Sequence, residues 1–252
     1  MALATGAARC DGLLSKWGGE CLPEAPARVV LVAAEEPASI IWLRLRNVVS
    51  SLSLADDLFD ALTPDELRRR LNMNLRIHAI GGESRLELIN ERLKPTGHAG
   101  ALHRVCDGAR LVMLDPLRQL HLADENSSQA MSPLVSVFKR LAHRTGAAVV
   151  YAHHTSRAGQ QMGLDQADAA RGSTALTADA RWQLNLSPVR REAAADLGLS
   201  AGQVEHYAML HLAKANYAPY RAPLLLQRQA GGVLRAAERP AKSDRPARRR
   251  GK

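Results

Sequence analysis

The segment Leu111-Val112-Met113-Leu114-Asp115 is an apolar run that ends in a carboxylate. Apolar residues in succession, without alternation, are typical of a strand that is buried on both faces, as in a parallel sheet. Two further runs have the same form, because residues 28–34 precede Glu35 and residues 147–152 precede His153-His154. The sequence therefore predicts an α/β fold whose strands carry polar side chains at their carboxyl ends.

Helix and strand patterns alternate along the rest of the chain. A capping box with proline in the first turn starts a helix at Thr63, and Gly146 ends a long amphipathic helix. The expected helices cover residues 1–12, 37–52, 63–71, 84–93, 98–108, 126–145 and 187–198, and the further strands 75–80, 181–186, 205–213, 224–229 and 233–235. This order favours a mostly parallel sheet flanked by helices, with a C-terminal β-hairpin. We expect one domain over residues 1–236 and a disordered basic tail over 237–252.

The composition narrows the classes of partner. The net charge of +9 and the pI near 10 favour a polyanion, with nucleic acid first. Residues 239–252 hold a net six of those charges, which leaves the body only weakly basic. The three cysteines form no C-x-x-C pair, so a reducing cytoplasm is expected and no disulfide framework. No apolar run approaches the ~20 residues that span a bilayer.

The ends of the three apolar runs form the candidate site. Parallel strands bring their carboxyl ends to one edge, where ligands bind, so Glu35, Asp115 and His153 are predicted to converge on one cleft. There, Asp115 fits a Walker B aspartate that holds Mg²⁺ through water, and Glu35 can orient or deprotonate an attacking water. His153-His154 can sense a phosphate. Taken singly, each also fits a plainer role in a turn or a strand end.

One expected element is absent from the sequence. The phosphate-binding loop G-x-x-x-x-G-K-[ST], whose backbone N–H groups and lysine hold nucleotide phosphates, occurs nowhere in the 252 residues. Lys16, which is followed by Trp17-Gly18-Gly19, is not part of such a loop, because the glycines that the motif requires before the lysine are missing. The chain thus combines most of a nucleotide-hydrolysing core with no phosphate cradle.

Five segments in order carry a family resemblance. They are Val-Val-Leu-Val-Ala-Ala-Glu-Glu-Pro at 29–37, Leu-Val-Met-Leu-Asp-Pro-Leu-Arg at 111–118, Val-Val-Tyr-Ala-His-His at 149–154, Ala-Arg-Gly-Ser-Thr-Ala-Leu at 170–176 and Lys-Ala-Asn-Tyr at 214–217. Together they resemble the RepA family, the RecA-like hexameric replicative helicases of broad-host-range plasmids, whose pattern bacterial and phage AAA-type ATPases share. The resemblance covers roughly residues 1–235.

The resemblance implies roles for the nucleotide site. It matches Glu35 to the catalytic glutamate, Asp115 to the Walker B aspartate and His153-His154 to the pair that reads the γ-phosphate. A neighbouring subunit would contribute a finger to the phosphates from the segments that hold Arg171, Arg181 and Lys214. An arginine there would stabilise the charge of the transferring phosphoryl group. The implied cofactors are ATP and Mg²⁺.

The resemblance also implies the partners. The loop 157–170, expected to be mobile, matches the region that faces DNA in the channel of the ring. Within it, Arg157, Gln160 and Gln161 can follow a DNA backbone, although the loop carries two aspartates as well. Single-stranded DNA and a homo-oligomer, a ring hexamer, are therefore the expected partners, and ATP hydrolysis driving translocation along the strand is the expected activity.

The missing loop leaves several interpretations open. In the family, the phosphate loop immediately precedes the helix that corresponds to residues 1–8 and follows the first strand of the sheet. We expect that the true start lies upstream, because three catalytic-type positions survive; the alternative is a decayed or regulatory relative that binds DNA without catalysis. A plain α/β protein with a cationic end is the third hypothesis. The genomic sequence just upstream of Met1 separates the first two.

Overall fold

The computed structural model describes residues 2–6, 16–17, 20–21, 25–53, 62–81, 85–154, 174–219 and 221–237. Its centre is a parallel sheet of four strands in the order β4-β3-β5-β6. These strands are β3 (Val29–Ala33), β4 (Leu75–Ala79), β5 (Leu111–Asp115) and β6 (Ala148–Tyr151). Since β3 pairs with both β4 and β5, the two most buried apolar runs lie side by side inside the sheet.

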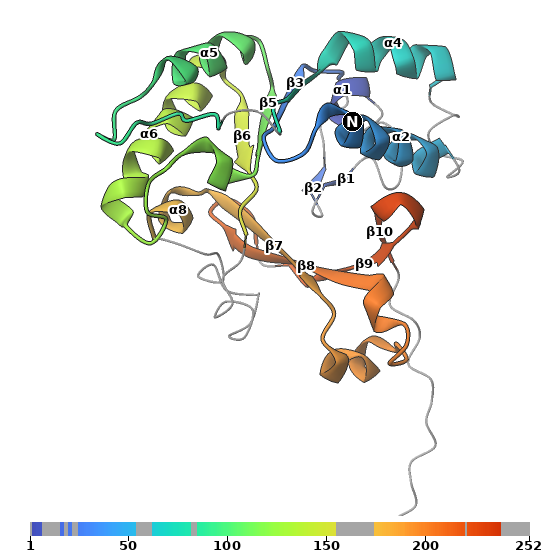
Figure 1. The fold of residues 1–252 in the computed structure, drawn as a ribbon. Helices are drawn as coiled ribbons and strands as arrows, with labels where there is room; N and C mark the ends of the chain where they lie inside the picture. Colours follow the sequence, from blue (N-terminus) through green and yellow to red (C-terminus); the bar gives the residue numbers. More distant parts are fainter. Residues whose placement is uncertain are drawn as a thin grey trace, which may run out of the picture.

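Helices α5 (Gly97–Val105) and α6 (Ser128–Thr145) cover one face of this sheet, and α1 (Ala2–Thr5), α2 (Ala38–Ser53) and α4 (Pro64–Asn74) lie on the other side (Figure 1). The main core lies under α5 and α6. Its buried side chains come from alternate strand positions and from one face of α6 (Val30, Val32, Val112, Leu114, Met131, Leu134, Phe138 and Leu141). The predicted α/β fold with a parallel sheet flanked by helices is confirmed.

Local signals explain where the two core helices begin and end. The Thr96 hydroxyl accepts a hydrogen bond from the His98 N–H, and Ser127 does the same for Ala130, so both helices have side-chain N-caps. Helix α6 ends at Gly146, whose φ of +68° is the left-handed conformation that glycine adopts without strain.

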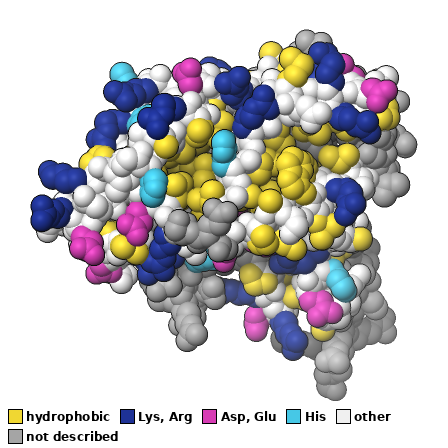
Figure 2. All heavy atoms as spheres, turned by 45° about the horizontal axis from the view of Figure 1, so that its top comes forward, with side chains coloured by type: hydrophobic (Ala, Val, Ile, Leu, Met, Phe, Trp, Pro, Cys, Tyr) yellow, Lys and Arg dark blue, Asp and Glu magenta, His cyan; other side chains and the backbone are white. Residues whose placement is uncertain are grey.

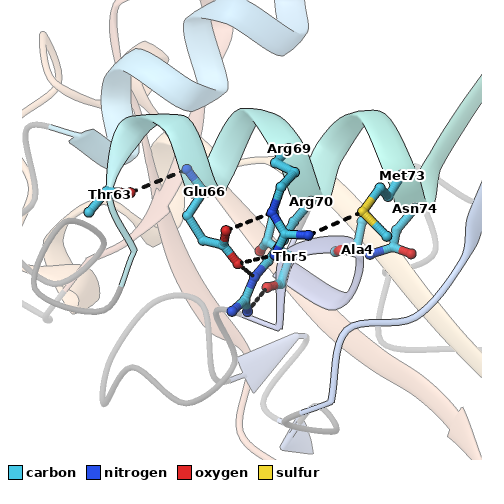
Figure 3. Close-up of polar contacts among 8 residues, drawn as sticks. All are labelled: Ala4, Thr5, Thr63, Glu66, Arg69, Arg70, Met73 and Asn74. Atoms are coloured by element: carbon cyan, nitrogen blue, oxygen red, sulfur yellow. Dashed lines mark hydrogen bonds and ion pairs between the residues drawn. The ribbon is translucent and has the colours of Figure 1, made fainter.

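Helix α4 holds the short helix α1 in place (Figure 3). Arg70 Nη1 donates to the Thr5 carbonyl at 2.7 Å, and Asn74 Nδ2 donates to the Ala4 carbonyl at 2.8 Å. Glu66 fixes Arg70 through an ion pair of 2.5 Å and also pairs with Arg69 at 2.8 Å. Two carbonyls of α1 thus receive donors from α4, and these two guanidinium groups lower the pKa of Glu66 to about 2.

A second sheet follows the parallel one in sequence. It is antiparallel, in the order β10-β9-β8-β7, and consists of β7 (Trp182–Pro188), β8 (Tyr207–Ala215), β9 (Leu224–Arg228) and β10 (Leu234–Ala236). It contains the predicted C-terminal hairpin, β9–β10. Helix α2 meets the hairpin turn, where Asn47 Nδ2 donates to the Gly231 carbonyl at 3.3 Å. The chain therefore forms a four-stranded parallel sheet and a separate four-stranded antiparallel one.

Three expected helices differ in the structure. The described part of 84–93 is irregular and closes a loop through an isolated bridge between Ile89 and Pro95, because Pro95 and the turn at Asn90 favour a bend over a helix. The segment after Pro188 forms two short 3₁₀ turns, Arg191–Ala193 and Ala195–Leu197, instead of an α-helix up to Gly198. In the first 12 residues, the described helix is limited to Ala2–Thr5.

Two small further strands, β1 (Lys16–Trp17) and β2 (Glu20–Cys21), pair with each other. The short helix α8 (Thr174–Asp179) packs beside α6, where Lys139 pairs with Asp179 at 2.6 Å. Three further 3₁₀ helices lie in the connections of the described chain, at Leu117–Leu120, Val204–His206 and Ala230–Gly232. In the described part of the chain, no helix meets the length and hydropathy needed to cross a membrane.

Candidate functional site

The register of the parallel sheet brings the predicted site residues to one edge. Ala33 is the partner of Asp115, and the Ala34 N–H donates to the Asp115 carbonyl at 2.7 Å. On the other side of β5, the Ala152 N–H donates to the Leu114 carbonyl at 2.9 Å. Glu35 and His153-His154 follow directly after these paired positions. The three strand ends therefore lie next to one another, as the sequence predicts.

Charges gather around the Asp115 carboxyl. Partial burial raises its pKa, and the neighbouring Glu35 and Glu36 carboxylates raise it further, whereas Arg44 and His154 act in the opposite direction. The edge is thus acidic, with two cationic or imidazole groups near the carboxylates. Glu35 and Asp115 are exposed, so both can reach a ligand.

The two histidines differ in their surroundings. His154 is exposed and acts electrostatically on Asp115. His153 is half-buried and acts electrostatically on His121, a fully buried side chain in the loop that follows β5. The structure therefore groups His154 with the acidic edge, and it groups His153 with the interior beneath that edge.

Two residues that the sequence argument did not select position the Glu35-Glu36 turn. Arg44, in the second turn of α2, donates from Nη2 to Glu36 Oε1 at 2.6 Å. Gly81, at the end of β4, lies so close that an added Cβ would overlap the Glu36 backbone. The glycine after a strand was the available signal for this close approach. Arg44 had no signal beyond its helix.

The loop after Asp115 is hydrogen-bonded to the end of the neighbouring strand β6. It begins with a cis peptide bond between Asp115 and Pro116, and the Leu117 N–H donates to the Ala152 carbonyl at 2.8 Å. Further along the loop, His121 Nε2 lies 3.8 Å from Glu125 Oε1. Burial lowers the pKa of His121, so the ring is held in its neutral form at neutral pH. Neither His121 nor Glu125 was predicted as a site residue.

The other predicted residues are partly described. Lys214 Nζ donates to the carbonyls of Thr177 and Ala178, at 2.7 and 2.8 Å, and so binds the last turn of α8. Arg181 is exposed just before β7. Outside the described residues lie the remaining finger candidate and the predicted DNA-facing residues, namely Arg171, Arg157, Gln160 and Gln161.

The acidic edge suits a hydrated Mg²⁺ ion. Magnesium is usually held by one or two carboxylates together with waters and substrate phosphates, and the carboxylates of Glu35 and Glu36 lie close enough to Asp115 to interact with it electrostatically. Among the described residues, no group of three or more acidic, histidine or cysteine side chains forms a dedicated metal cage. The sequence contains no glycine–lysine loop of the kind that holds nucleotide phosphates.

The parallel sheet thus brings Asp115 and Glu35 together at the edge where open α/β sheets bind ligands. A family model described as "AAA domain" matches residues 1–160. The chain therefore belongs to this AAA-domain family, a family of ATPases. Among solved structures, it is similar to "Crystal structure of the RadB recombinase", with 13% identity, a TM-score of 0.46, and coverage of 82% of this chain and 77% of that one.

Proposed function

We propose that this protein is an ATP-dependent DNA-processing motor of the replicative-helicase type, in which ATP hydrolysis drives movement along single-stranded DNA. The family match supports an ATPase core. The observation that carries the proposal is the gathering of Glu35, Asp115 and His154 at adjacent ends of three strands, with Glu35 acting on the pKa of Asp115. These groups come from distant parts of the chain, and only the sheet brings them together.

Each residue of the edge has a proposed task. When bound at Asp115, Mg²⁺ would neutralise phosphate charge. Glu35, an exposed carboxylate beside it, orients the attacking water and accepts its proton. His154 faces the same edge and detects the terminal phosphate. Arg44 holds Glu36, the neighbour of Glu35, and thereby fixes the turn from which the base projects.

His153 has a different proposed task. It acts electrostatically on the buried His121, which lies 3.8 Å from Glu125, and the Leu117 N–H joins the end of its strand to the loop that bears that pair. A change at the phosphate would therefore reach the loop after β5 through His153. We also propose that a neighbouring subunit of a ring supplies a cationic finger, for which Arg181 is the exposed described candidate.

The absent phosphate loop sets a condition on this proposal. The 252 residues contain no G-x-x-x-x-G-K-[ST] segment, which is the loop that usually holds the phosphates of ATP. By itself the chain should bind ATP weakly. A relative that binds DNA or regulates replication without hydrolysis is the second candidate function, and the missing cradle is the observation that favours it.

ATP hydrolysis with and without single-stranded DNA tests the proposal. Loss of a general base lowers turnover by about 10²- to 10⁴-fold, so Glu35→Gln should do this while leaving nucleotide binding unchanged. Glu91→Gln, which removes an exposed carboxylate from a different loop, serves as the matched control and should keep wild-type turnover. Stimulation by DNA in the wild type supports the motor. DNA binding without any hydrolysis supports the non-catalytic alternative.

A further inference from the structure

A groove runs between α5 and α6 and is lined by residues from both helices. It consists of two adjoining cavities of about 640 and 340 Å³, which share His103 and Arg144. Helices α5 and α6 end where β5 and β6 begin, so their last turns lie at the amino ends of the strands. Asp115 lies at the opposite, carboxyl end of β5. None of Glu35, Asp115 and His154 lines either cavity, so the groove is separate from the proposed nucleotide site.

The groove is strongly basic. Its lining includes four cations, Lys94, Arg104, Arg140 and Arg144, and one carboxylate, Asp107. Within the described part of the chain, none of the four cations has an ion pair with a carboxylate. Figure 2 shows Lys and Arg side chains crowded over the left of the molecule, where α5 and α6 lie. The groove thus presents positive charge that the chain itself leaves uncompensated.

One residue of the groove lining carries a buried nitrogen. His103 lines both cavities, and its Nδ1 has neither solvent contact nor a hydrogen-bond partner among the described residues. Burial lowers the pKa of His103, and the nearby Arg144 and Arg140 lower it further. An anion placed between the guanidiniums would remove the repulsion and offer the ring an acceptor.

Helix-end stabilisation accounts for part of this charge. Arg104 and Arg144 lie in the last turns of α5 and α6, where cations favour the negative end of the helix dipole. It does not account for Arg140, one turn earlier, or for Lys94, in the loop before α5. Arg140 and Arg144 are four residues apart and so project from the same face of α6, about one helical pitch of 5.4 Å apart.

We propose that this groove binds the sugar–phosphate backbone of a single nucleic-acid strand. Guanidinium groups pair with phosphates in a bidentate manner, and a row of them follows a chain of phosphates. The lining contains no Phe, Tyr or Trp on which a base could stack, and its apolar part is aliphatic (Leu93, Pro95, Ala99, Pro133 and Val137). Recognition is therefore through phosphates and independent of base sequence.

Fluorescence anisotropy of a labelled oligo-dT, titrated with the full chain in the absence of nucleotide, tests this site. Each phosphate contact to a single strand contributes about 0.7 to the slope of log K against log salt, which is roughly 5-fold in affinity at 0.1 M salt. The double variant Arg140→Gln, Arg144→Gln should therefore bind about 25-fold more weakly, with a slope smaller by about 1.4. The single variant Lys94→Gln should lose about 5-fold.

The matched control removes two exposed arginines elsewhere, Arg68 on α4 and Arg228 on β9, by the changes Arg68→Gln and Arg228→Gln. It keeps the net charge of the groove variant, so any general effect of charge appears in both. The proposal is overturned if the groove variant binds with wild-type affinity and slope, or if the control loses as much. Thermal melting of each variant shows whether the fold is retained, and Lys94→Gln gives the answer if the double variant unfolds.

A histidine NMR titration gives an independent readout. With the oligonucleotide bound, the pKa of His103 should rise from its lowered value, because phosphate stabilises the imidazolium form. An unchanged His103 titration contradicts binding in this groove. Inorganic phosphate at the same phosphate concentration should shift it far less; an equal shift would mean a site for small anions and would overturn a strand-binding groove.

Discussion

The change Gly81→Ala tests how the fold positions the proposed base. An added Cβ at this position would overlap the backbone N, C and O atoms of Glu36. These backbone atoms cannot avoid the added Cβ by a rotamer change, as the end of a flexible side chain can. Either β4 or the Glu35-Glu36 turn must therefore move. Overpacking of this kind costs about 1–3 kcal/mol. We expect a loss of stability of that size together with displacement of Glu35.

Urea denaturation followed by circular dichroism measures the loss, and Gly100→Ala is the matched control. A Cβ at Gly100 lies in ordinary van der Waals contact with Arg104 Nη1, at 3.7 Å, inside helix α5. Alanine there should stabilise the helix by about 0.5–1 kcal/mol. If Gly81→Ala is as stable as the wild type while Gly100→Ala behaves as expected, the close approach of β4 to the Glu36 turn is wrong.

Further predictions concern charge and packing. The pKa of Asp115 is raised, so the folded state binds the proton of this carboxyl more tightly than the unfolded state does, and the ionised carboxylate lowers stability above the folded-state pKa. Asp115→Asn should therefore raise the urea midpoint at pH 7. Below pH 3.8, the ordinary pKa of the group, the same change should leave the midpoint where it is. Glu66 shows the opposite sign: its pKa of about 2 gives stability above the ordinary 4.5 that is lost as the pH falls towards 2, and Glu66→Gln should remove this acid dependence of the urea midpoint. Leu134→Ala in the core should cost about 2–5 kcal/mol by urea denaturation, whereas Leu186→Ala, at a side chain that is 48% exposed, should cost much less.

The apolar runs at 28–34, 110–115 and 147–152 were predictable as strands because burial on both faces requires uninterrupted apolar residues. Their parallel pairing followed from the helices between them. The helix predicted over residues 84–93 is wrong, because the bridge from Ile89 to Pro95 and the turn at Asn90 hold the described part of this segment in a loop.

The candidate site was predictable only at its strand ends. The local signals are an apolar run that resembles a Walker B strand and ends in Asp115, and two other apolar runs followed by acidic or histidine residues. Parallel pairing of these strands places their ends side by side. Arg44, Gly81 and His121 contribute through contacts between segments that are distant or irregular in sequence. No periodicity or spacing marks such contacts, so they required the structure.

The apolar spacing of α2 raises a separate point. Ile40 and Leu43 belong to the apolar set at helical spacing that predicts this helix, yet both are exposed, at 37% and 41%. Figure 2 shows hydrophobic side chains gathered in the middle of the face turned to the viewer. Helical spacing thus predicted the helix correctly, whereas the burial of its apolar side was not realised among the described residues.

The most direct test of the central claim is paramagnetic broadening by Mn²⁺, used in place of Mg²⁺, in the NMR spectrum of the full chain with and without ATP. We expect the resonances of Glu35, Asp115 and His154 to broaden together and first, and Asp115→Asn to abolish the effect while Glu91→Gln retains it. Broadening that is absent from this edge, or unchanged in Asp115→Asn, would contradict a metal–phosphate site formed by the three strand ends.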